Sequence, residues 1–198
     1  DWTDPKSKTT NVYAKSKTLA EQAAWKFMEQ DTSGMELSTV LPAMVFGPIL
    51  EEDFGVSVGA ILDMMNGKYP IVPNWDMGVV DVRDVASLEL LAMTKPEAAG
   101  KRFVCSAENM FMKDQNEYLS ELFPESASKI PKRVAPNWLI KFLALFLPAL
   151  KMIAEGLGKE RSMDSSRARN LLGWNPRSAK EAVKSAAESA KEFGLIED

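Results

Sequence analysis

Apolar positions recur at helical spacing early in the chain. Within residues 11–30 they come in pairs every four residues: Leu19 and Ala20, Ala23 and Ala24, Phe27 and Met28. This spacing places them on one face of a helix, which Gly34 can end. Residues 36–46 (ELSTVLPAMVF) are β-branched and apolar and run into Gly47-Pro48, which is typical of a buried strand followed by a turn. A helix followed by a strand predicts an α/β arrangement.

The same alternation continues along the chain. We expect two further helices and two short strands, which gives a parallel or mixed sheet flanked by helices. The helices span 57–66 and 84–94, and the strands span 79–82 and 101–106. Beyond residue 113 the pattern becomes mainly helical, with helices expected at 114–123, 136–155, 165–172 and 178–193. The last begins with Ser178-Ala-Lys-Glu181, a capping box whose side chains can satisfy free backbone amides.

The most apolar stretch of the chain is 138–153 (WLIKFLALFLPALKMI). It includes Lys141, Pro148 and Lys151 and is shorter than the roughly 20 residues that cross a bilayer. We therefore expect a buried or pocket-lining helix and no membrane partner. Attachment to a membrane surface stays open as the alternative.

Composition narrows the possible functions. The 198 residues include 24 Lys and Arg against 28 Asp and Glu, a net charge of −4 without a cation-dense stripe, so we expect no nucleic-acid partner. The absence of His excludes Ser-His-Asp and Cys-His catalysis. The single Cys105 excludes an intramolecular disulfide and a cysteine-rich metal site, and it favours a reducing, cytoplasmic setting.

Tyr13 and Lys17 stand four residues apart on the first expected helix, so their side chains are neighbours on one face. An ammonium group beside a phenol favours the phenolate, and Tyr13 could then give or take a proton. Moving a Tyr pKa from about 10 to about 7 requires more than one nearby charge reliably supplies, so a further charge or hydrogen bond must contribute. The spacing alone also fits a solvated helix face, because it arises often by chance.

The surrounding segments make the pair more specific. YAKSKTLAEQAAWKF begins at Tyr13 and is followed in order by LPAMVFGP, VVDVRDVA, GKRFVCS and SSRARNLLGWNPRS. This ordered set resembles the extended short-chain dehydrogenase/reductase family, of the NAD-dependent epimerase/dehydratase type. More narrowly, it resembles the dihydroflavonol reductase-like carbonyl and aldehyde reductases.

The resemblance implies a fold and a domain organisation. The expected fold is the C-terminal part of a Rossmann-type doubly wound sheet with a mainly helical substrate-binding region. The sheet part would span 1–106 and the helical region 107–198, with interleaved segments from 49–78.

The resemblance also implies roles for individual residues. Tyr13 would donate a proton to a carbonyl oxygen as hydride arrives from a reduced nicotinamide, and Lys17 would hold the nicotinamide ribose. Pro42 and Val45 match the place where the family's backbone lies against the nicotinamide amide, and Ser57 falls in a loop that often touches the cofactor. Pro42 could instead simply end a strand, and Ser57 could be a helix N-cap. The implied cofactor is NADP, with NAD possible, the substrate is a small carbonyl compound, and no metal is implied.

Other candidate residues have structural explanations. Asp81 and Asp84 are expected to be cap or turn residues rather than catalytic carboxylates. Four large apolar side chains could line a pocket for a hydrophobic carbonyl compound, but residues of these types at helical spacing usually belong to a core. We expect core positions for Met64, Met65, Trp138 and Phe142.

Two parts of the family pattern are absent from the sequence. It has no G-x-G-x-x-G or G-x-x-G-x-x-G turn, and Gly156-Leu-Gly158 lacks a preceding strand. The family's active-site Ser or Thr would fall before Asp1. We therefore expect the chain to be the second half of a longer enzyme, inactive by itself and associated with the missing N-terminal half. A homodimer through the helix over 13–30, with its Ala-rich face, is a further expectation.

Two other functions stay open. The chain could be a non-catalytic binding or dimerisation module that retains the scaffold, and a cofactor titration would separate this from a reductase. It could also belong to a nucleotide-sugar epimerase or dehydratase, which shares the Tyr and Lys. The AEQAAW run and the late apolar stretch favour the reductase.

Overall fold

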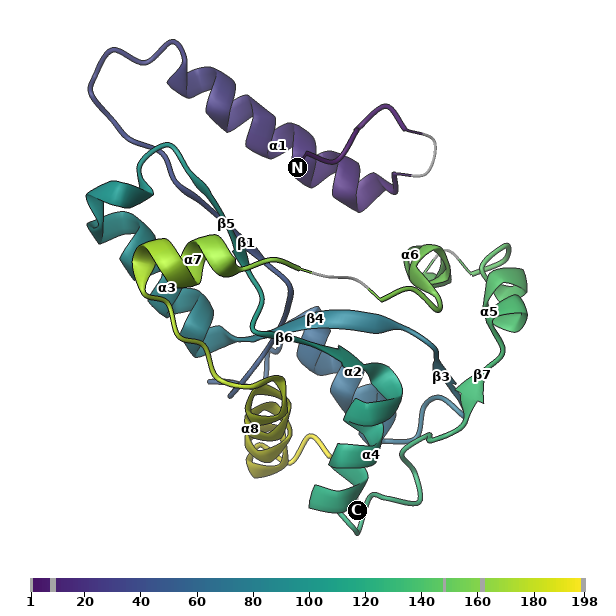
Figure 1. The fold of residues 1–198 in the computed structure, drawn as a ribbon. Helices are drawn as coiled ribbons and strands as arrows, with labels where there is room; N and C mark the ends of the chain where they lie inside the picture. The colour runs from purple at the N-terminus through teal and green to yellow at the C-terminus, as the bar shows by residue number, and fades with distance from the viewer. Residues whose placement is uncertain (1, 8–9, 148, 161–162, 197–198) are drawn as a thin grey trace.

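The computed structural model describes residues 2–7, 10–147, 149–160 and 163–196 (Figure 1). Within these residues, seven short strands form three small sheets, in the orders β1-β5, β2-β4-β6 and β3-β7. The strands are β1 (Thr39–Pro42), β2 (Met44–Phe46), β3 (Val72–Pro73), β4 (Asp76–Asp81), β5 (Arg102–Cys105), β6 (Glu108–Phe111) and β7 (Val134–Ala135). The expected α/β class is confirmed.

Helices surround the strands. They are α1 (Val12–Met28), α2 (Val56–Met65), α3 (Val82–Thr94), α4 (Met112–Leu122), α5 (Asn137–Leu143), α6 (Ala149–Gly156), α7 (Ser166–Leu172) and α8 (Ala179–Glu192), with a 3-10 turn at Pro96–Ala98. Figure 1 shows α3 and α7 beside β1 and β5, and α2, α4 and α8 together on the other side of β4. The helix α1 lies along the outside of this arrangement. No described helix is long and apolar enough to cross a membrane.

The single strand expected over 36–46 is interrupted at Ala43. Its first part, β1, pairs in parallel with β5, and its second part, β2, pairs in parallel with β4. The strands pack closely at this change of partner, because a Cβ on Gly78 of β4 would lie 3.1 Å from the Ala43 Cβ and 2.8 Å from the Ser106 hydroxyl. The chain thus passes from one sheet to the next where a glycine permits the approach.

Helix caps explain several boundaries. The Asn11 side chain accepts a hydrogen bond from the Ala14 amide at 2.8 Å and begins α1 as expected. The helix α3 begins at Val82, two residues earlier than expected, because Asp81 is its N-cap and accepts from the Arg83 amide at 2.9 Å. Asp81 is therefore a cap, as predicted.

The C-terminal helix confirms half of the expected capping box. The Ser178 hydroxyl accepts from the Glu181 amide at 3.2 Å. The Glu181 carboxylate lies 3.3 Å from the Arg177 guanidinium, within ion-pair distance. The reciprocal contact of a capping box is replaced by this ion pair.

The helix expected over 136–155 is two helices, α5 and α6, and Pro148 lies outside the described residues. The core positions expected for Trp138 and Phe142 are wrong, because their side chains are 69% and 53% exposed. A short helix can bury one stripe against a single neighbour, and here that stripe contains Ile140. In contrast, Met64 and Met65 belong to the main core, as expected.

Candidate active site

The candidate proton donor and its neighbouring cation lie at the start of α1. The Lys17 ammonium nitrogen is 5.8 Å from the centre of the Tyr13 ring, close enough for a cation–π contact. Tyr13 is 66% exposed and Lys17 is also exposed. The cap at Asn11 holds this first turn of the helix in place. A phenol and an ammonium group are thus adjacent and accessible to a small molecule.

Glu21 attaches α1 to the sheet two turns beyond Tyr13. Its carboxylate accepts from the Arg102 guanidinium of β5 at 2.7 and 2.8 Å and from the Thr39 hydroxyl of β1 at 2.8 Å. The hydrogen bond from Arg102 lowers the pKa of Glu21, against the effect of burial. The charged bridge therefore fixes where the Tyr13 end of α1 lies relative to β1.

Sequence reasoning did not identify Glu21 or Arg102 as site-forming residues. Both belong to quoted segments, AEQAAW and GKRFVCS, so the sequence signal was present without a partner assigned to either charge. The Arg102 guanidinium also lies 3.8 Å from the centre of the Trp2 ring. Only the fold brings residues 2, 21 and 102 together.

Two of the predicted cofactor-contacting residues lie where β1 passes into β2. Pro42 ends β1 and is exposed, so the alternative that it ends a strand is correct as a description of the backbone. Val45 lies in β2 opposite Val80 and is half-buried. In open α/β sheets, ligands bind beyond the carboxyl ends of the parallel strands. Pro42 lies at such an end, at the last position of β1.

The turn after β2 depends on a glycine. Gly47 has a φ of +120°, and a Cβ there would lie 3.0 Å from an Asp81 carboxylate oxygen and 3.1 Å from the Val82 nitrogen. From this turn the chain runs to α2, and the Ser189 hydroxyl of α8 accepts from the Ile49 amide at 3.0 Å on the way.

Ser57 is the second residue of α2, whose N-cap is Gly55. The alternative that Ser57 is itself the N-cap is therefore wrong. Its side chain is half-buried in the first turn of the helix.

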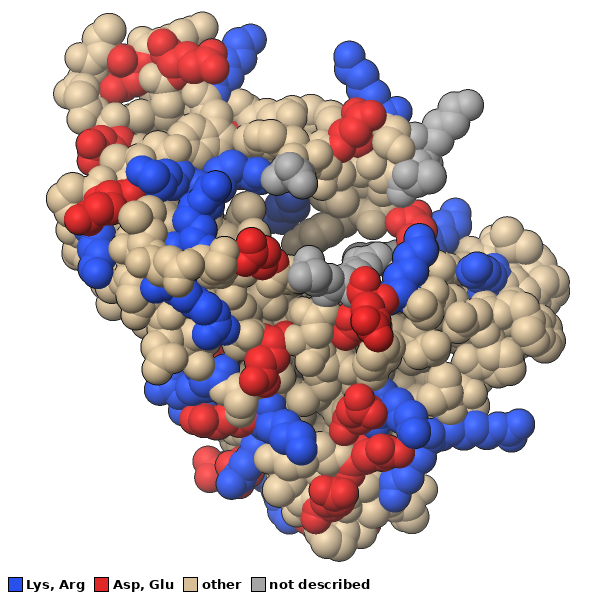
Figure 2. Space-filling view, in the orientation of Figure 1, with Lys and Arg blue, Asp and Glu red and all other residues tan. Residues whose placement is uncertain are grey.

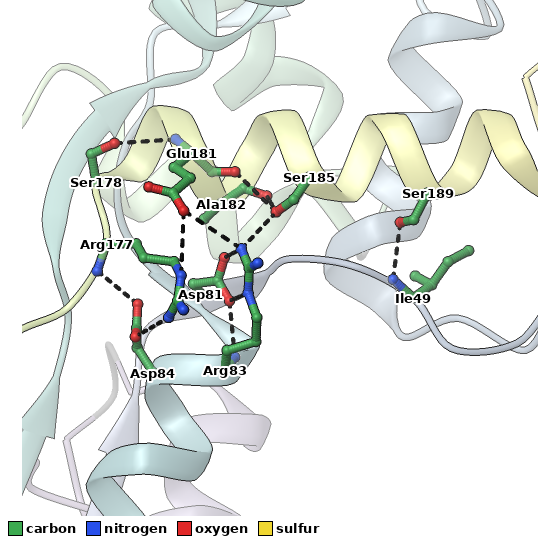
Figure 3. A network of polar contacts seen from close by, with 10 residues as sticks. All are labelled: Ile49, Asp81, Arg83, Asp84, Arg177, Ser178, Glu181, Ala182, Ser185 and Ser189. Atoms are coloured by element: carbon green, nitrogen blue, oxygen red, sulfur yellow. Dashed lines mark hydrogen bonds and ion pairs between the residues drawn. The ribbon is translucent and has the colours of Figure 1, made fainter.

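Two ion pairs lie at the start of α3, facing α8 and the segment before it (Figure 3). Arg83 binds the Asp81 carboxylate through two nitrogens, at 2.8 and 2.6 Å. Burial raises the pKa of Asp81, but the hydrogen bonds from Arg83 outweigh it and leave the pKa lowered. Asp84 accepts from the backbone and side chain of Arg177 at 2.7 and 2.5 Å. The expectation that Asp84 is a cap or turn residue is therefore wrong. Asp84 is the carboxylate that attaches the segment before α8 to α3.

The predicted site residues form two groups. Tyr13 and Lys17 are in contact on α1, whereas Pro42, Val45 and Ser57 lie on β1, β2 and α2. No hydrogen bond or ion pair between the two groups is present in the described part of the chain. Their relative position depends on the Glu21 bridge.

No protein-family model matches the chain, but individual relatives do. It is 30% identical over 200 residues to NADPH-dependent methylglyoxal reductase GRE2 of Saccharomyces cerevisiae, which covers 97% of this chain and 54% of that protein. It is 36% identical over 132 residues to cinnamoyl-CoA reductase CAD2 of Medicago truncatula, covering 66% of this chain and 38% of that protein. The chain thus spans about half the length of the first relative.

Solved structures agree with these relatives. The structure of yeast Gre2 complexed with NADPH superimposes with a TM-score of 0.68 at 28% identity, over 93% of this chain and 52% of that one. A nucleoside-diphosphate-sugar epimerase from Pseudomonas aeruginosa gives a TM-score of 0.77 at 19% identity over 99% of this chain and 60% of that one, which supports the fold alone. With the ordered segments and the α/β architecture, these similarities establish the family. The chain belongs to the dihydroflavonol reductase-like group of the extended short-chain dehydrogenase/reductase family.

Proposed function

We propose that this chain supplies the proton-donating half of an NADPH-dependent reductase of small aldehydes or ketones. The observation that carries the proposal is the Tyr13–Lys17 pair, accessible on α1 within a chain 30% identical to a methylglyoxal reductase over 97% of its length. The two named relatives are a methylglyoxal reductase and a cinnamoyl-CoA reductase, which favours reduction over a non-catalytic module.

In this proposal each predicted residue has one task. Tyr13 donates its hydroxyl proton to the carbonyl oxygen, which becomes the alcohol. Lys17 stabilises the phenolate that forms when Tyr13 loses its proton, and it binds the nicotinamide ribose. Pro42 and Val45 present backbone to the nicotinamide amide, and Ser57 contacts the cofactor at the start of α2. Bound NADPH supplies the hydride.

The proposal includes a second half of the enzyme. The chain contains no glycine-rich turn of the kind that binds a pyrophosphate, so the strands that hold that group belong to an N-terminal half. The cytoplasmic setting and the division into a sheet part (1–106) and a helical substrate-binding region (107–198) belong to the same proposal. NADP is the proposed cofactor because yeast GRE2 is named an NADPH-dependent reductase, and the matching structures include NADPH complexes of Gre2 from yeast and from Candida albicans.

A homodimer through α1 is a related proposal. The helix buries a single residue, Thr18, while Val12, Leu19 and Phe27 are exposed along it. Such an apolar helix surface is typical of a subunit interface. Pairing two copies there would cover these side chains.

The test uses the protein that contains this chain. Tyr13→Phe should lower kcat for NADPH-dependent carbonyl reduction by about 100-fold or more, because the proton donor is lost, while NADPH affinity stays unchanged. Tyr69→Phe is the matched control, since Tyr69 is also exposed and lies in the loop after α2, where its hydroxyl donates to the Asp63 carboxylate. Unchanged turnover in Tyr13→Phe would refute the role of Tyr13. Conversion of a nucleotide sugar without net NADPH consumption would favour the epimerase alternative.

A further inference from the structure

A set of large apolar side chains is exposed on α5 and on the turn that continues it. We call this set the α5 face: Trp138, Phe142, Leu145, Phe146 and Leu147, each between 50% and 73% exposed. The backbone bond from the Phe146 amide to the Leu143 carbonyl continues the helical turn. The rings of Phe142 and Phe146 pack edge to face, with centres 5.5 Å apart.

The opposite side of α5 is already packed. Ile140 is buried with Leu157 and Ala135, and Ile153 of α6 packs against the same cluster. The α5 face is therefore not a core surface that a small rearrangement could bury. A contiguous apolar surface of this size usually marks a binding site.

The charged residues nearest to the α5 face in the sequence are mostly cations. Residues 126–154 contain five Lys and Arg and no Asp or Glu, with Glu125 and Glu155 at either side of this stretch, in a chain whose net charge is −4. Four of these cations are exposed, and none of the four has an ion-pair partner in the described part of the chain: Lys132, Arg133, Lys141 and Lys151. In Figure 2 the lobe that contains α5, at the right, is mostly a tan surface with blue side chains, and red atoms lie only at its inner edge.

We propose that the α5 face binds the surface of a membrane rich in anionic phospholipids. Aromatic and leucine side chains that enter the headgroup region, surrounded by lysines that remain at the phosphates, are the features that place a short helix at such an interface. This binding is peripheral and does not depend on the proposed reductase function.

A second copy of the chain fits this face less well. Two-fold pairing through the α5 face would bring the cations of one copy against the same cations of the other. A phospholipid headgroup instead supplies the opposite charge. Charge complementarity therefore favours the lipid surface.

The test is co-sedimentation of the chain with lipid vesicles. Vesicles of phosphatidylcholine with about 30% phosphatidylserine should retain the chain, and vesicles of phosphatidylcholine alone should retain much less. The double variant Phe142→Glu, Phe146→Glu should lower binding about tenfold or more, because it places charge in the apolar surface. Lys141→Glu with Lys151→Glu should act in the same direction. The matched control is Leu90→Glu with Met93→Glu on α3, which changes two equally exposed apolar residues elsewhere.

Three results would overturn the proposal. The first is equal binding to both kinds of vesicle, or binding that the α5 variants leave intact although circular dichroism shows them folded. The second is binding by this chain but not by the longer protein that contains it, which would mean that another segment covers the face. The third is self-association that the α5 variants abolish, which would identify a second copy as the occupant.

Discussion

At the scale of single residues, the carboxylate of Glu21 is shared between the Arg102 guanidinium and the Thr39 hydroxyl, each on a different strand. Both charged side chains are mostly buried, with 12% and 23% exposed. A charge-assisted contact of this kind is worth more than a surface ion pair, because water competes less for it. This pair therefore holds α1, a helix that buries little of its own surface.

We expect Glu21→Gln to lower the free energy of unfolding by about 1 to 3 kcal/mol, because Arg102 loses a charged partner. It should also speed amide exchange along α1, measured by mass spectrometry. The pKa of Glu21 is lowered from its ordinary value of 4.5, so the bridge stabilises the fold fully above that pH. Its contribution is lost as the pH falls through the lowered value.

Glu29→Gln is the control for this variant, since Glu29 is an exposed residue at the end of the same helix. It should change neither stability nor exchange. Equal effects of the two variants would show that the Glu21 bridge does not hold α1.

Cap residues show what local chemistry can predict at this scale. Asp81 and Ser178 precede helices in the sequence and are caps in the structure. Asp84 has the same side chain, yet it binds Arg177 from a segment 93 residues away. A partner that distant leaves no local pattern, so only the fold could assign it.

At the scale of elements, the Asp81–Arg83 pair joins β4 to the start of α3. Asp81 is fully buried, while its partner Arg83 is partly exposed. The Arg83 guanidinium also lies 3.2 Å from the Ser185 hydroxyl of α8. The pair therefore lies where β4, α3 and α8 meet, with Asp81 close to Gly47.

Arg83→Gln should lower the free energy of unfolding by about 2 to 3 kcal/mol near neutral pH, because it leaves a buried carboxylate without its cation. The lowered pKa of Asp81 stabilises the fold above its ordinary value of 3.8, and this contribution is lost as the pH falls through the lowered value. The difference in the free energy of unfolding between the unchanged chain and the Arg83→Gln variant should therefore shrink in acid. Urea denaturation of both proteins, near neutral pH and in acid, measures this difference.

Arg133→Gln supplies the comparison, because this exposed arginine has no ion pair in the described chain. A stability difference for Arg83→Gln that does not change with pH would contradict the role of the Asp81 charge.

Element boundaries followed local signals only in part. The helix over 57–66 and the strand over 101–106 were predicted closely, since capping, glycine stops and apolar runs are local. The strands β3 and β7 were not predicted, because two-residue strands exist only through their pairing with each other. The polar β6 was not predicted for a similar reason, since its antiparallel pairing with β4 gives it strand geometry.

At the scale of the whole molecule, β1 has an unpaired edge. The Thr39 and Ala43 amides donate toward β5, and no described strand pairs with the opposite side. Natural proteins usually cover such an edge. The exposed apolar residues of α1 add a second surface suited to a partner.

We therefore expect the isolated chain to self-associate at micromolar concentrations. Sedimentation velocity should show species larger than the 21.9 kDa monomer. Leu19→Glu with Phe27→Glu should reduce association if α1 is the interface, and Lys26→Glu, also on α1 and exposed, is the charge-matched control. A stable monomer that unfolds cooperatively would show that neither the edge nor α1 needs a partner.

The sequence alone determined the α/β class, the family, the main helices and the spacing of Tyr13 and Lys17. These depend on periodicity, caps and motifs, which are formed by residues close to one another in the sequence. The tertiary structure decided the Glu21 bridge, the division of 36–46 between two sheets, and the exposure of the α5 face. Each of these depends on which distant segments of the chain come into contact. Whether an apolar side chain is buried is decided by these contacts and not by its residue type alone.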